Sequence, residues 1–183
     1  MSIHSFIEKY DCGVLSTFRT SLISCDGDEI GFNLNIIDDE SRNKYLKAAL
    51  MWLDYGVTDI DGSYVQLFLL DNQIDVKEGS FFVVNLSNDS MFINNIKKLG
   101  EVFCQDSVLI IACGGHHNYF VGANKSNLPS YGEVISVRTF NPETESNLTG
   151  FGSQPFSLET LSSIQINSKR VVYEFAKPVI DLL

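Results

Sequence analysis

The stretch Ser80-Phe81-Phe82-Val83-Val84-Asn85-Leu86 is apolar at four consecutive positions, 81–84. Successive side chains of a β-strand point to opposite faces of the sheet, so both faces of this segment would be hydrophobic. Strands with two apolar faces lie in the interior of sheets that are covered on both sides. We therefore expect residues 80–86 to form a central strand around which the rest of the fold is built.

Two long amphipathic helices are predicted, one on each side of this strand in the sequence. Asp38, Asp39 and Glu40 put negative charge where the dipole of the first helix favours it, and Gly56 is placed to end that helix. Asn88 is a favourable N-cap for the second helix. The apolar faces comprise Leu46, Ala49, Leu50 and Leu53 in the first helix and Phe92, Ile96, Leu99 and Phe103 in the second.

The remaining elements are predicted from shorter patterns. They are a helix at 2–10, a strand at 14–19, a hairpin of 57–60 and 63–70 that turns at Asp61-Gly62, a hairpin of 107–113 and 119–121, and strands at 133–140 and 170–175. Residues 141–157 are rich in turn-forming residues and predict a long loop, and residues 176–183 predict a short C-terminal tail. The expected fold is one α+β domain spanning 1–183, with a mixed, mostly antiparallel sheet and two main helices packed on one face.

The chain is acidic, and its charge is unevenly distributed. The net charge is −10, and residues 1–92 hold 15 acidic against 6 basic side chains. Such a charge repels phosphates, so we expect neither direct DNA binding nor membrane binding. The excess either keeps the protein soluble or forms a partner-binding face that docks on a basic surface or imitates a phosphate backbone. The residues of that predicted face are Asp26, Asp28, Asp38, Asp39 and Glu40.

Apolar runs are too short for a membrane span, and the N-terminus does not resemble a signal peptide. We therefore expect a cytoplasmic protein with four free thiols, at Cys12, Cys25, Cys104 and Cys113. Their spacing does not match a metal site, and no cofactor is expected. The hydrophobic surplus and the segment 179–183 favour a homodimer as one arrangement.

Several short motifs recur in a familiar order over roughly residues 10–135. They are Thr17-Phe18-Arg19, Arg42-Asn43, Gly62-Ser63-Tyr64, Ser80-Phe81, Gln105-Asp106-Ser107, Gly122 with Asn124, and Tyr131-Gly132. Their order resembles a family of small proteins from tailed bacteriophages related to bacterial domains of the DUF3293 type. The resemblance implies an accessory protein that works in bacterial cytoplasm, and it implies no catalytic mechanism. Here Ser41 stands before Arg42, where the family has an Asn, so a polar contact at this point differs.

Two groups of residues are candidates for ligand binding or catalysis. Arg19 and Arg42 could grip phosphate or carboxylate together with Asn43 and Tyr64, or they could form structural salt bridges. The second group could form a polar cluster, with a histidine as general base, or could serve only as turn and helix-end residues. It comprises Gln105, Asp106, Ser107, His116 and His117.

Three classes of function remain open. We favour a binding protein that inhibits or redirects a host factor, such as a defence protein. The first alternative is a protein that sequesters a small nucleotide-like ligand in an arginine-lined pocket. The second is an enzyme acting on nucleotides or nucleic acid, which requires Asp106, His116 and His117 to converge within about 3 Å.

Overall fold

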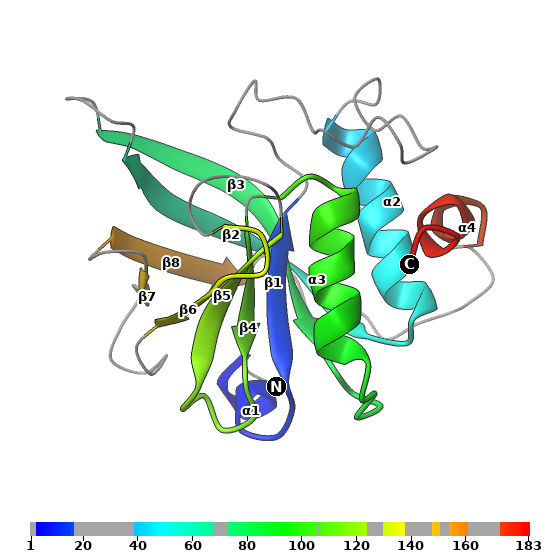
Figure 1. The fold of residues 1–183 in the computed structure, drawn as a ribbon, viewed down its shortest axis with the longest axis horizontal. Coiled ribbons are helices and arrows are strands. Elements are labelled where there is room, and N and C mark those ends of the chain that lie inside the picture. The colour runs from blue at the N-terminus through cyan, green and yellow to red at the C-terminus, as the bar shows by residue number, and fades with distance from the viewer. Residues whose placement is uncertain are drawn as a thin grey trace.

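In the computed structural model, a curved antiparallel sheet runs through the molecule, and helices cover both of its faces (Figure 1). The residues that the structure describes are 3–16, 39–67, 73–105, 107–123, 130–137, 148–150, 154–160 and 173–183. Their helices are α1 (Ile3–Ile7), α2 (Asp39–Trp52), α3 (Phe92–Val102) and α4 (Tyr173–Ile180). No helix in these ranges is long and apolar enough to cross a membrane.

Eight strands among the described residues join in the order β6-β5-β4-β1-β3-β2-β8-β7. They are β1 (Cys12–Ser16), β2 (Gly56–Leu67), β3 (Gln73–Val84), β4 (Ser107–Ile111), β5 (Asn118–Gly122), β6 (Val134–Val137), β7 (Leu148–Gly150) and β8 (Gln154–Thr160). The predicted α+β class is confirmed. All seven pairings in the described part of the sheet are antiparallel, so the expected parallel component is not found there.

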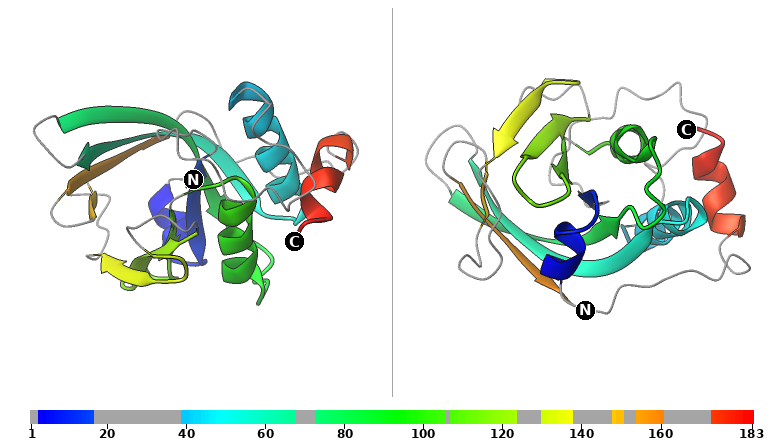
Figure 2. Two further views of the ribbon diagram at one scale, coloured as in Figure 1. Left: turned by 45° about the horizontal axis from the view of Figure 1, so that its top comes forward. Right: turned by 90° about the horizontal axis from the view of Figure 1, so that it is seen from below.

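The central position predicted for residues 80–86 is confirmed, because β3 lies between β1 and β2 and buries both of its faces. Phe81 and Val83 pack beneath α2 and α3. Phe82 and Val84 pack on the opposite face, where Phe6 of α1 joins them. The two main helices therefore cover one face, as expected, and the short N-terminal helix covers part of the other (Figure 2).

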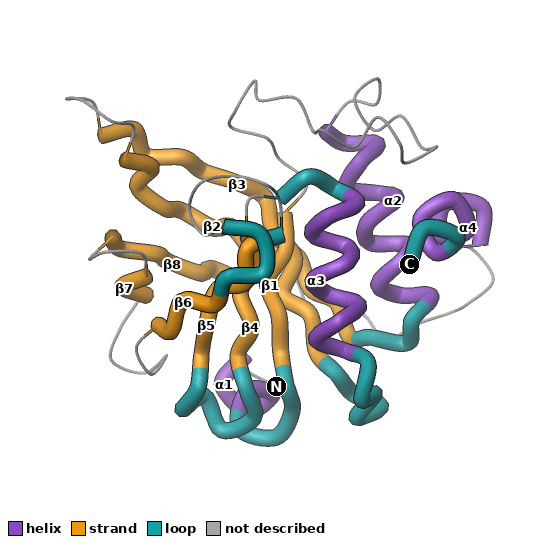
Figure 3. Tube along the Cα trace, viewed as in Figure 1, coloured by secondary structure: helices purple, strands orange, loops and turns teal. Residues whose placement is uncertain are grey.

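The turn predicted at Asp61-Gly62 is wrong, because β2 runs straight through both residues. Asp61 pairs with Gly79 of β3 and with Glu159 of β8, and Gly62 pairs with neighbours on both sides as well. Hydrogen bonds to β3 on one side and to β8 on the other stabilise the extended backbone of β2. This stabilisation outweighs the local preference of Asp-Gly for a turn. The connection between β2 and β3 lies outside the described residues, and the paired strands extend beyond the rest of the sheet (Figure 3).

The predictions for the C-terminal third need correction. The expected long loop at 141–157 contains β7 and the start of β8, which pair with each other. The expected strand at 170–175 and tail at 176–183 are wrong from Tyr173 onward, where α4 begins. Ala176 and Val179 are fully buried, and this spacing of three residues is helical. Packing of that stripe thus decides the structure of the segment.

The first long helix ends earlier than Gly56 suggested. Asp54 takes a left-handed backbone conformation, with φ of 62°. The amide of Tyr55 then donates to the carbonyl of Leu50 at 3.2 Å, and the amide of Asp54 donates to that of Met51 at 3.1 Å. These two bonds define a Schellman motif, in which glycine is the usual residue at the left-handed position. Gly56 instead begins β2.

The second long helix begins at a hydrogen-bonded cluster of Tyr55, Asp89 and Asn95, which we call the clamp. Sequence patterns did not reveal it. The Tyr55 hydroxyl donates to Asp89 Oδ2 at 2.7 Å, and Asn95 Nδ2 donates to the same hydroxyl oxygen at 2.9 Å. Asp89 Oδ1 accepts from the amide of Met91 at 2.9 Å. Asn88, the predicted cap, instead has a left-handed backbone with φ of 53°. The clamp joins the end of α2 to the start of α3.

The clamp also sets how stability should depend on pH. Burial and the hydrogen bond to Asp89 raise the pKa of Tyr55 well above its ordinary value of 10.0. The hydrogen bond from Tyr55 holds the pKa of Asp89 below its ordinary value of 3.8. As pH rises, Tyr55 therefore ionises in the unfolded state, at its ordinary pKa of 10.0, before it ionises in the folded state. The free energy of unfolding that the clamp contributes is thus fully present below pH 10 and is lost above it.

We expect Tyr55→Phe to lower the free energy of unfolding by about 1 kcal/mol at neutral pH, because two polar side chains lose a partner. The difference between wild type and variant should shrink above pH 10. Urea titrations at several pH values measure both effects, and NMR titration should show the pKa of Asp89 rising. If the difference in unfolding free energy between wild type and Tyr55→Phe stays constant to high pH, the pKa of Tyr55 is not raised by folding.

Gly100 allows α3 to lie close to the sheet. A Cβ at this position would lie 2.5 Å from Val108 Cγ1 and 2.9 Å from Ala123 Cβ, and both residues are buried. We expect Gly100→Ala to lower the free energy of unfolding, because overpacking costs about 1–3 kcal/mol and exceeds the gain in helix propensity. Asn94→Ala, on the exposed side of α3, is the control and should not destabilise in urea denaturation. Equal stabilisation by both variants would contradict the close approach.

Candidate functional site

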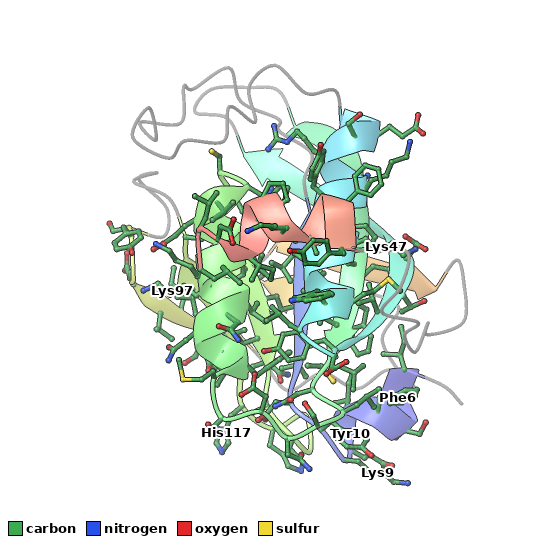
Figure 4. The ribbon with its side chains drawn as sticks, turned by 90° about the vertical axis from the view of Figure 1, so that its right-hand side faces the viewer. Phe6, Lys9, Tyr10, Lys47, Lys97 and His117 are labelled. Atoms are coloured by element: carbon green, nitrogen blue, oxygen red, sulfur yellow. The ribbon has the colours of Figure 1, made fainter. Side chains whose placement is uncertain are left out.

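Helix α4 lies across the outer side of α2 (Figure 4), and four aromatic side chains surround the contact. At its centre, Ala48 of α2 and Ala176 of α4 belong to one small hydrophobic cluster. Small side chains let the two helix backbones approach closely. The rings of Trp52 and Tyr173 meet edge to face with centroids 5.3 Å apart, and those of Tyr45 and Phe175 meet similarly at 5.4 Å. We call these four residues the α2–α4 aromatic surface.

Two of these rings are held in place and yet face solvent. Tyr173 is 51% exposed and Phe175 is 42% exposed, although each contacts a ring of α2. The two residues flank the buried stripe of α4, so that one ring lies on each side of the helix. Edge-to-face contacts fix ring orientation without covering the ring. The result is a pre-ordered aromatic surface that sequence patterns missed, because this segment was predicted as a strand.

Charged residues lie on the same two helices. Lys177 Nζ and Asp181 Oδ2 of the α4 segment are 2.6 Å apart, and Lys44 Nζ and Glu40 Oε1 of α2 are 3.0 Å apart. The hydrogen bond from Lys177 to Asp181 raises the pKa of the lysine. Among the residues predicted to form an acidic face, Asp39 begins α2 and Glu40 is exposed. Asp26, Asp28 and Asp38 lie outside the described residues.

Arg42 has a structural position rather than that of an exposed anion binder. Its side chain is 4% exposed, and Nη2 donates to the carbonyl of Phe103 at 2.7 Å. That carbonyl lies at the C-terminal end of α3, where the helix dipole favours a positive charge. This bond fits the structural role that was one of the two expectations for Arg42, and a joint anion site with Arg19 and Tyr64 stays a prediction. Asn43, next in the chain, is half-buried, Arg19 lies outside the described residues, and Tyr64 is described only by its backbone pairing to Val76 and Phe156.

The connection from α3 to β4 is a second Schellman motif. Cys104 takes the left-handed conformation, with φ of 57°. The amide of Gln105 donates to the carbonyl of Gly100 at 2.8 Å, and the amide of Cys104 donates to that of Glu101 at 3.0 Å. Gln105 is buried and follows by two residues Phe103, whose carbonyl accepts from Arg42. The structure thus brings Arg42 and Gln105 to the same helix end, and Asp106 lies outside the described residues.

The two histidines lie far from this helix end. His116 and His117 are both exposed, in the turn that follows β4, whereas Ser107 begins that strand. Four residue steps along a strand separate the two ends by about 13 Å. Ser107 and the histidines therefore do not share a site. Figure 4 shows His117 near the same end of the molecule as Tyr10.

The turn with the histidines is held by hydrogen bonds to the end of α1 and to the residue before β1. The amide of Cys113 donates to Asp11 Oδ1 at 2.9 Å, and the amide of Gly114 donates to the carbonyl of Ile7 at 2.8 Å. Asn118 Nδ2 also donates to the carbonyl of Gly115 at 3.0 Å. Within the described ranges, no three side chains of metal-binding type gather in one place. The contacts of this turn thus order its backbone.

The cysteines differ from the expectation of four free thiols. Cys104 is disulfide-bonded, and its partner lies outside the residues that the structure describes. Cys12 and Cys113 are free, the first buried and the second exposed. Burial raises the pKa of the Cys12 thiol far above its ordinary value, with a smaller contribution from Asp11. The Cys12 thiol is therefore unreactive at neutral pH.

A scan of the chain against protein-family models finds no match, and a search of curated proteins finds none either.

We expect Ala176→Leu to detach α4, because the larger side chain cannot fit between two fully packed helices. Trp52 is the only tryptophan, and its fluorescence emission should shift to longer wavelength as Tyr173 moves away. Lys177→Leu places the same side chain at an exposed position of α4 and should leave the emission unchanged. An unchanged spectrum in Ala176→Leu would contradict the packing described for α4.

Proposed function

We propose that the protein acts by binding a partner protein through the α2–α4 aromatic surface. The observation that supports this proposal most directly is the pair of half-exposed rings, Tyr173 and Phe175, each held by a ring of α2. Tyrosine, tryptophan and phenylalanine are enriched at the centres of protein interfaces. Rings that are ordered before binding lose little conformational entropy when a partner covers them. The surface therefore has the composition and the order that a binding site requires.

The charge of the chain supports a partner with a basic or neutral surface. A net charge of −10 attracts a basic protein over long distances and raises its association rate. Glu40 on α2 and Asp181, the residue after α4, contribute exposed carboxylates. Each is paired with a lysine, so these charges would guide orientation more than affinity.

The partner that we propose is a protein of a bacterial host, and the effect is inhibition or redirection of a host factor such as a defence protein. The support for this class of partner is the resemblance of the motifs at Arg42-Asn43, Gln105-Asp106-Ser107 and Tyr131-Gly132 to proteins of tailed bacteriophages. Under this proposal the protein works in the bacterial cytoplasm.

The test is quantitative affinity purification from bacterial lysate with matched baits. We expect at least one host protein to be retained by the wild type and to be depleted about 30-fold by Tyr173→Ala with Phe175→Ala, since hot-spot residues contribute about 2 kcal/mol or more. The control bait carries Met91→Ala and Ile93→Ala, which remove exposed apolar side chains at α3. It should retain the same host protein.

Calorimetry with the purified host protein then measures the loss of affinity directly. Circular dichroism, together with slow amide exchange at Val179, which is fully buried in the wild type, establishes that α4 remains docked in the double variant. A host protein that binds both baits equally would place the interface elsewhere, and an absence of any retained protein would count against partner binding itself.

A further inference from the structure

The disulfide of Cys104 lies just beyond the end of α3, and the sequence leaves one cysteine to be its partner. The chain has four cysteines, of which Cys12 and Cys113 are free. These two lie at the far end of β4, whereas Cys104 precedes its start. The five residues of β4 extend about 13 Å, and a disulfide joins Cα atoms at most about 7 Å apart. The remaining cysteine is Cys25.

Cys25 lies outside the described residues, but the strand that leads into its segment ends close to Cys104. Strand β1 pairs with β4, and their register, continued to the end of β1, places Ser16 opposite Ser107. Ser107 begins β4 and is three residues beyond Cys104. The chain therefore enters the segment 17–38 beside the connection that holds Cys104.

The helix that follows the segment also begins close to Cys104. Arg42, in the first turn of α2, donates to the carbonyl of Phe103 at 2.7 Å, and Phe103 precedes Cys104. Figure 1 shows the end of β1, the start of α2 and the end of α3 at the same end of the molecule. Both ends of the segment 17–38 thus converge on Cys104, so Cys25 in between is within reach of it.

The described fold at this helix end does not depend on the disulfide. The backbone hydrogen bonds of the Schellman motif close α3, and Arg42 holds the last carbonyl. Phe103 and Gln105 are buried on either side, whereas Cys104 is only half-buried. A disulfide at such a position is accessible to small thiols. Opening the bond therefore leaves the core contacts of α3 in place.

We propose that Cys25 and Cys104 form a reversible disulfide, which acts as a thiol–disulfide switch on the segment 17–38. Closing the bond ties this segment to the end of α3 between its two anchored ends, and opening it removes that tie. Asp26 and Asp28 are next to Cys25, so the switch acts on part of the acidic face predicted from the sequence. The inference is independent of the α2–α4 aromatic surface, because none of those four rings belongs to the segment.

The bond forms by exchange with a small disulfide such as oxidised glutathione. One cysteine thiolate attacks a glutathione sulfur, and a mixed disulfide forms as the first glutathione thiolate leaves. The second cysteine thiolate attacks the protein sulfur of the mixed disulfide and displaces the second glutathione. Two electrons pass from the cysteine sulfurs to glutathione, and the two thiol protons end on the released glutathione thiolates. Excess reduced glutathione reverses both steps.

Peptide mapping tests the pairing. The protein is equilibrated with oxidised glutathione, alkylated in denaturant, digested without reduction and analysed by mass spectrometry. We expect one cross-linked pair of peptides, which contains Cys25 and Cys104, and the mass of a single chain on a non-reducing gel. A Cys104 that is alkylated, bound to glutathione or joined to any other cysteine overturns the proposal.

Titration with glutathione tests whether the bond is a switch or a permanent support. Structural disulfides resist reduction by the glutathione pool. In buffers of rising reduced fraction we expect the bond to open without denaturant, while near-ultraviolet circular dichroism still shows a folded protein. A bond that opens only in denaturant, or an opening that unfolds the protein, overturns the switch.

Amide exchange tests which residues the switch acts on. Residues next to Cys25 should exchange about tenfold more slowly in the oxidised than in the reduced protein, because the tie restricts local opening. Cys25→Ser leaves α3 unchanged and should exchange at the reduced rate in both buffers. The matched control is Cys113→Ser, which removes the exposed free thiol and should respond as the wild type does. Equal rates in the two redox states, or a response that persists in Cys25→Ser, overturns the proposal.

Discussion

The burial of both faces of one short segment, Phe81 to Val84, is the constraint on which the rest of the structure depends. Each of these four side chains is at most 3% exposed, and they alternate between the two hydrophobic clusters of the molecule. A strand of this kind cannot lie at an edge or beneath a single layer. It requires strands on both sides, supplied by β1 and β2, and helices on both faces.

The parts of the fold that could be predicted are those decided by local hydrophobic periodicity. The two long helices and the hairpin of β4 and β5 follow from such patterns, because the side chains that repeat are the ones that become buried. The turn at Asp61-Gly62 failed because pairing on both edges of β2 is a non-local effect. The strand predicted at 170–175 failed because only α2 reveals that Ala176 and Val179 form a buried helical stripe.

The candidate site could be predicted less well than the fold. Arginine, histidine and aspartate attract attention in a sequence because of their chemistry, but Arg42 donates a hydrogen bond to a helix-end carbonyl and the histidines lie in an exposed turn. The α2–α4 aromatic surface depends on two helices meeting from opposite ends of the chain. This arrangement has no local sequence signature, so it became visible only in three dimensions.

The position of β1 in the sheet has a consequence for how the chain folds. This strand precedes the other described strands in the chain, but its two neighbours are β3, up to Val84, and β4, up to Ile111. Contacts of such large sequence separation require long loops to close before any pairing stabilises them, and this slows folding. During synthesis the strand Cys12–Ser16 cannot pair with β4 until the chain has been made as far as Ile111. The two halves of the sheet that meet at β1 are therefore joined only after the elements between β1 and β4 have been made.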